Sequence, residues 1–226
     1  MDGYDIYRDI AERTGGDIYI GVVGPVRTGK STFIKRFMDL LVLPNIENTY
    51  TRERAKDELP QSASGRNIMT TEPKFVPNEA VEISVGDNTD FRVRMIDCVG
   101  YLVPEAEGHM DGDMPRMVHT PWSETTMPFA EAAETGTRKV ITDHSTVGIV
   151  VTTDGSVTEL DRENYLDAEA RVIAELQALG KPFVVLLNTA TPYAQETQTL
   201  RAEMETQYGV PVLAVNVAQL KADDIR

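Results

Sequence analysis

Residues 24–31 of this 226-residue chain form a glycine-rich loop with the spacing G-x-x-x-x-G-K-S. An extended apolar stretch, residues 17–23, precedes the loop, and a helical pattern, residues 31–38, follows it. Backbone N–H groups of such a loop and the N-terminus of the next helix can surround a phosphate chain, while Lys30 reaches the β and γ oxygens and the Ser31 hydroxyl binds Mg²⁺. We therefore predict a nucleoside triphosphate site with these binding residues: Gly24, Pro25, Val26, Arg27, Thr28, Gly29, Lys30, Ser31 and Thr32.

A second motif, D-x-x-G, runs from Asp97 to Gly100 at the end of an apolar strand pattern. A carboxylate at a strand tip can hold Mg²⁺ through water, and Gly100 can offer its N–H to the γ-phosphate. Between the two motifs lie Thr70 and Thr71, either of which could supply a second hydroxyl ligand; a solvated, hydroxyl-rich loop is the alternative. The predicted Mg²⁺ ligands are Ser31, Thr70, Thr71 and Asp97.

We expect residues 188–191, Asn-Thr-Ala-Thr, to select the nucleotide base, since GTPases carry the sequence N/T-K-x-D at this place. Thr191 cannot form the charge-assisted, bidentate pair that an aspartate makes with guanine, and Thr189 lacks the long aliphatic stem of a lysine. The remaining hydroxyl and amide groups, including Asn188 as a predicted nucleotide-binding residue, are compatible with adenine. We therefore expect ATP rather than GTP.

The elements that position these motifs alternate between strand and helix patterns, which predicts an α/β fold with a doubly wound, mostly parallel sheet. Two alternating strands joined by the turn-forming residues 86–88 predict an antiparallel hairpin at the edge of this sheet. The connections 44–78 and 98–128 hold few core-forming residues and are expected to be functional loops. The expected strands cover residues 17–23, 80–85, 91–96, 146–151, 182–187 and 211–215, and the expected helices cover 31–38, 129–144, 160–179 and 195–208.

Composition excludes several classes of partner. With 22 basic and 36 acidic residues the chain has a formal charge of −14, which disfavours binding to nucleic acid or directly to anionic lipid. No apolar run approaches the roughly 20 residues of a transmembrane helix, so no direct membrane insertion is expected. A single cysteine precludes an intrachain disulfide and suits a reducing cytoplasm.

The whole chain closely resembles the stage IV sporulation protein A family, morphogenetic ATPases of the spore coat. The segments that carry this resemblance are residues 15–19, 26–31, 57–60, 73–78, 97–101, 120–122, 134–141 and 152–155. The resemblance implies a P-loop NTPase fold like that of the translation-factor GTPases, with ATP and Mg²⁺ as cofactors. It also implies that residues 1–226 are one ATPase domain, the N-terminal part of a longer protein.

By the same resemblance, ATP hydrolysis drives assembly of the spore coat basement layer around the forespore, in the mother-cell cytoplasm at the outer forespore membrane. The expected partners are further copies of the full-length protein, spore coat proteins, and a small amphipathic membrane peptide that binds the absent C-terminal region. The alternative function is a nucleotide-gated regulatory module, for GTP or ATP, with little hydrolysis. Tyr101, which stands where translation factors carry a water-positioning histidine, favours this alternative.

Arg27 lies three residues before Lys30, where cation-dependent relatives carry an asparagine that helps to hold K⁺. One hypothesis makes Arg27 an internal arginine finger that stabilises charge on the transferring phosphoryl group. The other makes it a surface arginine that is solvated or paired with an acidic side chain. The predicted catalytic residues are Lys30, Thr70, Thr71, Asp97 and Arg27.

Overall fold

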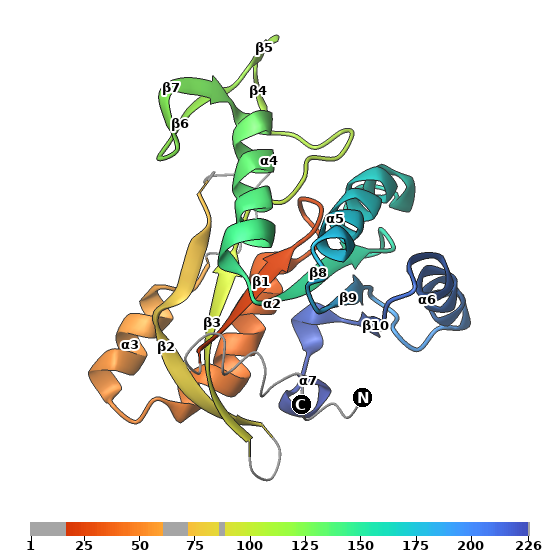
Figure 1. Ribbon diagram of the computed structural model, residues 1–226. Coiled ribbons are helices and arrows are strands. Elements are labelled where there is room, and N and C mark those ends of the chain that lie inside the picture. Colours follow the sequence, from red (N-terminus) through yellow and green to blue (C-terminus); the bar gives the residue numbers. More distant parts are fainter. Residues whose placement is uncertain (1–16, 61–71, 86–88, 226) are drawn as a thin grey trace.

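The computed structural model describes residues 17–60, 72–85 and 89–225. Its centre is a six-stranded sheet with the order β10-β9-β8-β1-β3-β2, in which all neighbouring strands are parallel except β2 and β3 (Figure 1). The strands are β1 (Asp17–Val23), β2 (Lys74–Val85), β3 (Thr89–Asp97), β8 (Val147–Thr153), β9 (Phe183–Asn188) and β10 (Val212–Val215). The predicted mostly parallel sheet with an antiparallel hairpin at its edge is therefore confirmed.

The strand registers bring the carboxyl ends of the parallel strands to one edge of the sheet. In the β1–β3 pair Val22 lies opposite Asp97, and in the β8–β9 pair Thr153 lies opposite Asn188. β1 and β8 are themselves neighbours. The loops that leave these four strands consequently start side by side, at the edge where open α/β sheets bind ligands.

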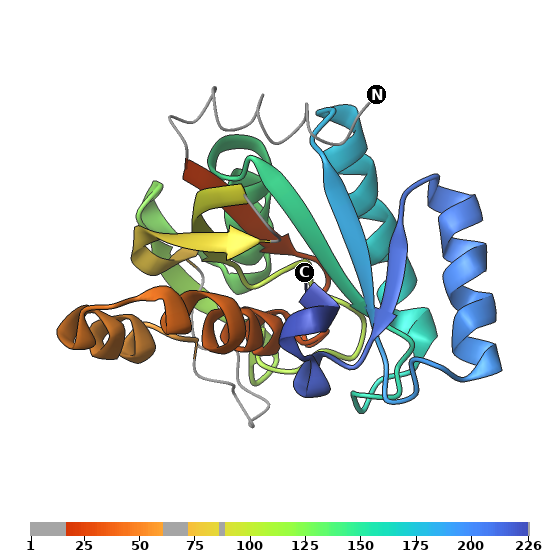
Figure 2. The same cartoon turned by 90° about the horizontal axis from the view of Figure 1, so that it is seen from below.

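Helices cover both faces of the sheet, as a doubly wound fold requires (Figure 2). Ile34 and Phe37 of the first helix join a hydrophobic cluster that includes Val93, whereas Val172 and Ile173 belong to a second cluster. The helices are α2 (Lys30–Phe37), α4 (Phe129–Lys139), α5 (Leu166–Ala178) and α6 (Gln195–Tyr208); π-helical turns, Met38–Val42 and Val140–His144, extend α2 and α4, and 3-10 turns cover Leu43–Asn45 and Arg162–Tyr165.

Both connections that were expected to be loops contain regular structure. The first holds α3 (Thr49–Asp57), which the Asn48 side chain caps by accepting a hydrogen bond from the Thr51 N–H at 3.0 Å. The sequence pattern missed this helix because Ala55 is the one residue in it that is buried, so no apolar period marks it. β2 also begins within this connection, at Lys74 rather than at residue 80.

The second connection folds into two short hairpins that project beyond the N-terminal end of α4 (Figure 1). They are β4 (Met110–Asp111) with β5 (Met114–Pro115), and β6 (Met117–Thr120) with β7 (Ser123–Pro128). The chain end forms a 3-10 turn, Val217–Gln219, and a single helical turn, α7 (Ala222–Ile225). Within the described ranges no helix is long and apolar enough to cross a membrane.

Candidate functional site

The glycine-rich loop connects β1 to α2 along a path that requires glycine at two positions. Gly24 has a φ of 133°, and a Cβ there would lie 2.3 Å from the Val151 carbonyl oxygen. Gly29 has a φ of 99°, and a Cβ there would lie 2.5 Å from Asn188 Nδ2. Only glycine permits such angles together with such close approaches, which explains the G-x-x-x-x-G spacing.

The start of α2 is arranged to receive an anion. Its N-cap is Gly29, and no side chain in the described part of the chain caps it. The N–H groups of the first turn are therefore available to phosphate oxygens, and the positive end of the helix favours negative charge there.

Lys30 is buried, with 4% of its surface exposed, and its Nζ donates a hydrogen bond to the Pro25 carbonyl at 2.5 Å. Burial lowers the pKa of Lys30, and nearby Cys98 and Asp97 oppose that change. A Cβ added to Gly100 would lie 2.6 Å from the same Nζ. The structure thus brings the lysine of the first motif against the glycine of the second.

Ser31 and Asp97, predicted to be Mg²⁺ ligands, are in contact: Ser31 Oγ donates to Asp97 Oδ2 at 2.9 Å. The other carboxylate oxygen, Oδ1, is buried and has no hydrogen-bond partner among the described residues. Burial raises the pKa of Asp97, and Lys30, Ser31 and other neighbours oppose the rise.

This pair fits a Mg²⁺ ion that also binds phosphate. Mg²⁺ usually binds one or two protein oxygens together with waters and substrate phosphates, and an unpartnered buried carboxylate oxygen supplies the charge it needs. In the described ranges no group of three or more His, Cys, Asp or Glu side chains could hold a metal by itself. Ser31 and Asp97 are therefore the described residues that suit the ion. The other predicted ligands, Thr70 and Thr71, lie outside the described residues.

Gly100, predicted to contact the γ-phosphate, has a hydrogen-bond partner that the sequence did not indicate. Its N–H donates to Thr137 Oγ1 at 3.1 Å, and that buried hydroxyl donates to the Ala133 carbonyl at 2.8 Å within α4. A γ-phosphate at this position would compete with Thr137 for the Gly100 N–H. The local sequence of α4 gives no sign of this role, because the contact joins residues that are 37 positions apart.

Tyr101 is fixed to the glycine-rich loop by its backbone and to α5 by its side chain. Its N–H donates to the Gly24 carbonyl at 3.2 Å, and its own carbonyl accepts from the Val26 N–H at 2.9 Å. Its hydroxyl donates to Glu175 at 2.5 Å, and the Arg171 guanidinium lies 4.2 Å from the ring centroid. Burial and Glu175 raise the pKa of Tyr101. Tyr101 stands where translation factors carry a water-positioning histidine, and its hydroxyl is bonded to Glu175 of α5.

Arg27 has a φ of 62°, in the left-handed region that non-glycine residues seldom adopt, and its side chain is partly exposed. Residues held in this region are often found at functional sites. Burial raises the pKa of Tyr165, while Thr158 and the charge of Arg27 oppose the rise. The charge of Arg27 is therefore close enough to the Tyr165 hydroxyl to influence its pKa.

Asn188 joins three segments rather than standing at the end of its strand as an isolated ligand. Its Nδ2 donates to the Thr28 carbonyl at 2.9 Å, and its Oδ1 accepts from the Val217 N–H at 3.1 Å. The asparagine thus ties the glycine-rich loop to the loop after β10. Next to it, Thr189 Oγ1 donates to Asp154 Oδ2 at 2.6 Å, a contact that sequence reasoning missed.

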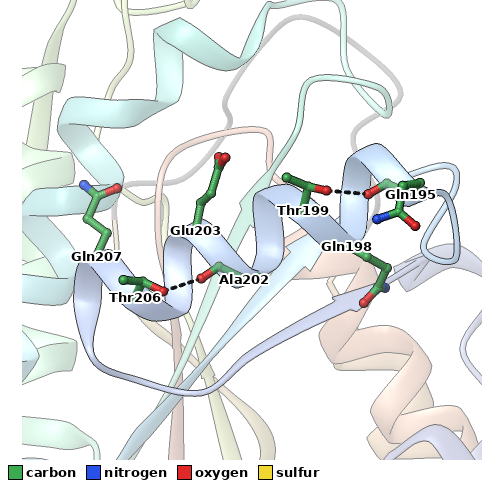
Figure 3. A pocket seen from close by; sticks show the side chains of 7 residues that line it. All are labelled: Gln195, Gln198, Thr199, Ala202, Glu203, Thr206 and Gln207. Carbon is green, nitrogen blue, oxygen red and sulfur yellow. Dashed lines mark hydrogen bonds between the residues drawn. The ribbon is translucent and has the colours of Figure 1, made fainter.

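A shallow groove of about 590 Å³ on α6 contains none of the predicted site residues (Figure 3). Two of its hydroxyls, on Thr199 and Thr206, donate to carbonyls of the helix itself. The groove is lined by Gln195, Gln198, Thr199, Ala202, Glu203, Thr206 and Gln207. The candidate site is therefore the sheet edge, where the described residues of both motifs meet.

Comparison with protein families gives a match over residues 1–226 to the family described as "Stage IV sporulation protein A, ATPase domain". The stage IV sporulation protein A of Bacillus anthracis is 58% identical over 225 residues, which is 100% of this chain and 46% of the relative. That of Clostridioides difficile (strain 630) is 59% identical over 221 residues, which is 98% of this chain and 45% of the relative. The chain thus spans less than half the length of these curated relatives.

Among solved structures, the chain is similar to a crystal structure of an Era variant from Aquifex aeolicus bound to GDP.AlF4-, with a TM-score of 0.53. The sequence identity is 11%, and the match covers 93% of this chain and 54% of that chain. A likeness at this identity concerns the fold alone. The likeness confirms the predicted P-loop NTPase fold of the GTPase type.

Proposed function

Since the chain belongs to the stage IV sporulation protein A family, of which it spans the ATPase domain, we propose that it binds ATP with Mg²⁺ and hydrolyses it to ADP and phosphate. The observation that carries the proposal is the Ser31–Asp97 pair, whose buried Oδ1 lacks a partner in the described ranges, beside the buried ammonium of Lys30. These are the groups that a Mg²⁺–triphosphate needs, a carboxylate and a hydroxyl for the ion and a cation for the phosphates.

Each predicted residue has a defined task in this proposal. N–H groups of the loop and of the start of α2 bind the phosphates, except at Pro25, which has none, and at Val26, whose N–H donates to the Tyr101 carbonyl. Lys30 moves from the Pro25 carbonyl to the β and γ oxygens. Ser31 and Asp97 hold Mg²⁺, which neutralises charge on the phosphates when it is bound. Gly100 donates its N–H to the γ-phosphate. Catalysis by such a site consists mainly of positioning and electrostatic stabilisation.

Thr70 and Thr71 are proposed to close over Mg²⁺ and the γ-phosphate, as a first switch loop does. The double change Thr70→Ala, Thr71→Ala should keep most nucleotide binding and lose hydrolysis. Equal turnover by this variant and the unmodified protein would contradict the assignment of the switch to these two residues.

For Arg27 we propose the role of an internal arginine finger. In support, an L-residue is kept at a φ of 62° in the middle of the phosphate-binding loop, where glycine would avoid strain. Arginine fingers contribute roughly 10³ to 10⁵ in rate. Arg27→Ala should therefore lower kcat far more than ATP affinity, and hydrolysis should not change when K⁺ replaces Na⁺. Strong K⁺ dependence of the unmodified protein would assign the charge to a bound cation instead.

In the full-length protein, we propose, hydrolysis drives self-assembly into the basement layer of the spore coat, on the cytoplasmic side of the outer forespore membrane in the mother cell. Spore coat proteins and a small amphipathic membrane peptide are the proposed partners, the latter through the region beyond residue 226. The acidic charge of −14 supports indirect rather than direct attachment to anionic lipid.

Phosphate release from ATP and from GTP, measured side by side with and without Mg²⁺, tests the activity. We expect Mg²⁺-dependent turnover with ATP and little with GTP. The second candidate function, a nucleotide-gated switch with little hydrolysis, is favoured by the engagement of the Tyr101 hydroxyl with Glu175. It predicts tight Mg²⁺–ATP binding, measured by titration with a fluorescent ATP analogue, together with no turnover in the phosphate-release assay.

A further inference from the structure

The loops after β8 and β9 are joined by a cluster of hydrogen bonds centred on Asp154. Thr189 Oγ1 donates to Asp154 Oδ2 at 2.6 Å. Asp154 Oδ1 accepts from both the N–H of Ser156, at 3.0 Å, and its hydroxyl, at 2.5 Å. One carboxylate on the β8 loop therefore holds a hydroxyl of its own loop and a hydroxyl of the loop where the base is expected to be chosen.

The two hydroxyls held by Asp154 in turn accept hydrogen bonds from the backbone of the β9 loop. Ser156 Oγ accepts from the Ala190 N–H at 2.9 Å, and Thr189 Oγ1 accepts from the Thr191 N–H at 3.2 Å. The Thr189 N–H donates to the Val215 carbonyl at 2.9 Å. All three consecutive N–H groups after Asn188 are thus used inside the protein.

The loop that carries Asp154 is held by hydrogen bonds to Arg162 and to Thr153. Arg162 makes a two-point contact with the fully buried Glu169, at 2.5 and 2.7 Å, and donates to the Thr153 carbonyl at 3.0 Å. The Gly155 N–H donates to Thr153 Oγ1 at 3.0 Å, and Gly155 has a φ of 91°. The backbone before Asp154 is therefore held by part-buried hydrogen bonds, through an arginine that is itself anchored on the buried Glu169.

The availability of N–H donors matters for the choice of base. Guanine presents the O6 acceptor where adenine presents the N6 amino donor. A loop with free N–H groups can donate to O6 and so favours guanine. A loop whose N–H groups are already used offers no backbone donor to O6, and a guanine placed there loses hydrogen bonds that it makes to water.

We propose that Asp154 is a positioning residue for base specificity: through Ser156 and Thr189 it engages the N–H groups of Ala190 and Thr191 and so disfavours guanine. This inference rests on the proposed function, since it explains how the site would prefer ATP. Two features would then disfavour guanine. One is the absence of an aspartate at residue 191, and the other is the use of the loop N–H groups, which depends on Asp154 at the end of the neighbouring strand.

Matched substitutions at residue 189 test the proposal. Thr189→Val keeps the shape and removes the hydroxyl, and so frees the Thr191 N–H. Thr189→Ser keeps the hydroxyl and serves as the control. We measure the dissociation constants of fluorescent ATP and GTP analogues. The ratio of GTP to ATP affinity should rise about 2- to 10-fold in Thr189→Val, the value of one hydrogen bond, and should stay unchanged in Thr189→Ser.

Ser156→Ala provides an independent arm, because Ser156 is exposed and its removal should leave the fold intact while it frees the Ala190 N–H. Amide hydrogen exchange at residues 190 and 191 supplies a readout that does not depend on nucleotide: exchange should accelerate at residue 190 in Ser156→Ala and at 191 in Thr189→Val. Melting curves verify that each variant is folded.

The outcomes separate this inference from the proposed function. If the unmodified protein prefers ATP and the affinity ratio does not change in folded Ser156→Ala and Thr189→Val, the role of Asp154 is overturned and ATP binding stands. If the unmodified protein binds GTP as tightly as ATP, both the role of Asp154 and the proposed choice of ATP are wrong.

Discussion

Polar groups are paired differently in two parts of the site. We call them the phosphate end, around Lys30 and Asp97, and the base end, around Asp154 and the Arg162–Glu169 pair that supports it. At the phosphate end Lys30 is buried against a single carbonyl, and Asp97 Oδ1 has no partner in the described ranges. At the base end Asp154 and Glu169 are each held by several donors. Unpaired buried charge is costly, whereas a fully bonded network is rigid. The phosphate end thus gives up stability that a charged ligand can restore. At the base end both carboxylates are already paired, although Arg162 Nε is buried without a partner among the described residues.

Lys30→Ala should have the largest effect, because it removes the cation from the phosphate end. Loss of two charge-assisted hydrogen bonds to phosphate corresponds to roughly 3–6 kcal/mol of binding free energy, or more than 100-fold in ATP affinity. Lys35→Ala, at an exposed position of the same helix, is the matched control. Titration with a fluorescent ATP analogue measures both, and equal affinity of the two variants would remove the lysine from the phosphate site.

Arg162→Met should be the most damaging change at the base end, where it leaves the carboxylate of Glu169 buried without its cation. Breaking one side of a buried pair costs about 3–5 kcal/mol of folding free energy. Arg201→Met, which breaks a half-buried pair with Glu205, should cost less than about 1 kcal/mol. Urea unfolding of the three proteins measures the difference. A similar midpoint for both variants would contradict the view that the base end is held by buried charge.

Asp97→Asn should stabilise the protein in the absence of nucleotide. Burial raises the pKa of Asp97, so folding favours the protonated acid and the charged form is held at a cost at neutral pH. A neutral amide removes that cost, and we expect a gain of about 1–3 kcal/mol. We expect Mg²⁺ and ATP to raise the melting temperature of the unmodified protein and not that of Asp97→Asn. A lower melting temperature of Asp97→Asn without nucleotide would show that the buried, charged carboxylate does not destabilise the fold.

Thr137→Val should have the smallest effect. The Gly100 N–H cannot donate to Thr137 and to the γ-phosphate at once, so removal of the hydroxyl removes a competitor. One hydrogen bond of about 1 kcal/mol corresponds to an approximately fivefold rise in affinity for a non-hydrolysable ATP analogue relative to ADP. Thr137→Ser, which keeps the hydroxyl, should match the unmodified protein. An unchanged ATP-to-ADP ratio in the valine variant would separate α4 from phosphate recognition.

Much of the fold could be predicted from the sequence, because the apolar runs of the parallel strands and the glycine spacing of the loop are strong local signals. The antiparallel hairpin was also predictable, from alternation on two strands around a turn. α3 was not predictable, because a helix with a single buried residue has no apolar period. The short hairpins of residues 110–128 were missed for a related reason: their strands are mostly exposed and carry no core pattern.

The sequence by itself determined which residues could bind phosphate and metal, since G-x-x-x-x-G-K-S and D-x-x-G each need specific side chains at a fixed local spacing. Only the tertiary structure decided what these residues touch. The parallel registers place Asp97 against Ser31 and leave its Oδ1 without a partner in the described ranges, and they place Asp154 beside Thr189 although 35 residues separate them. Contacts of this kind depend on which strands are neighbours in the sheet, and burial then decides which of them is satisfied and which remains to be completed by a ligand.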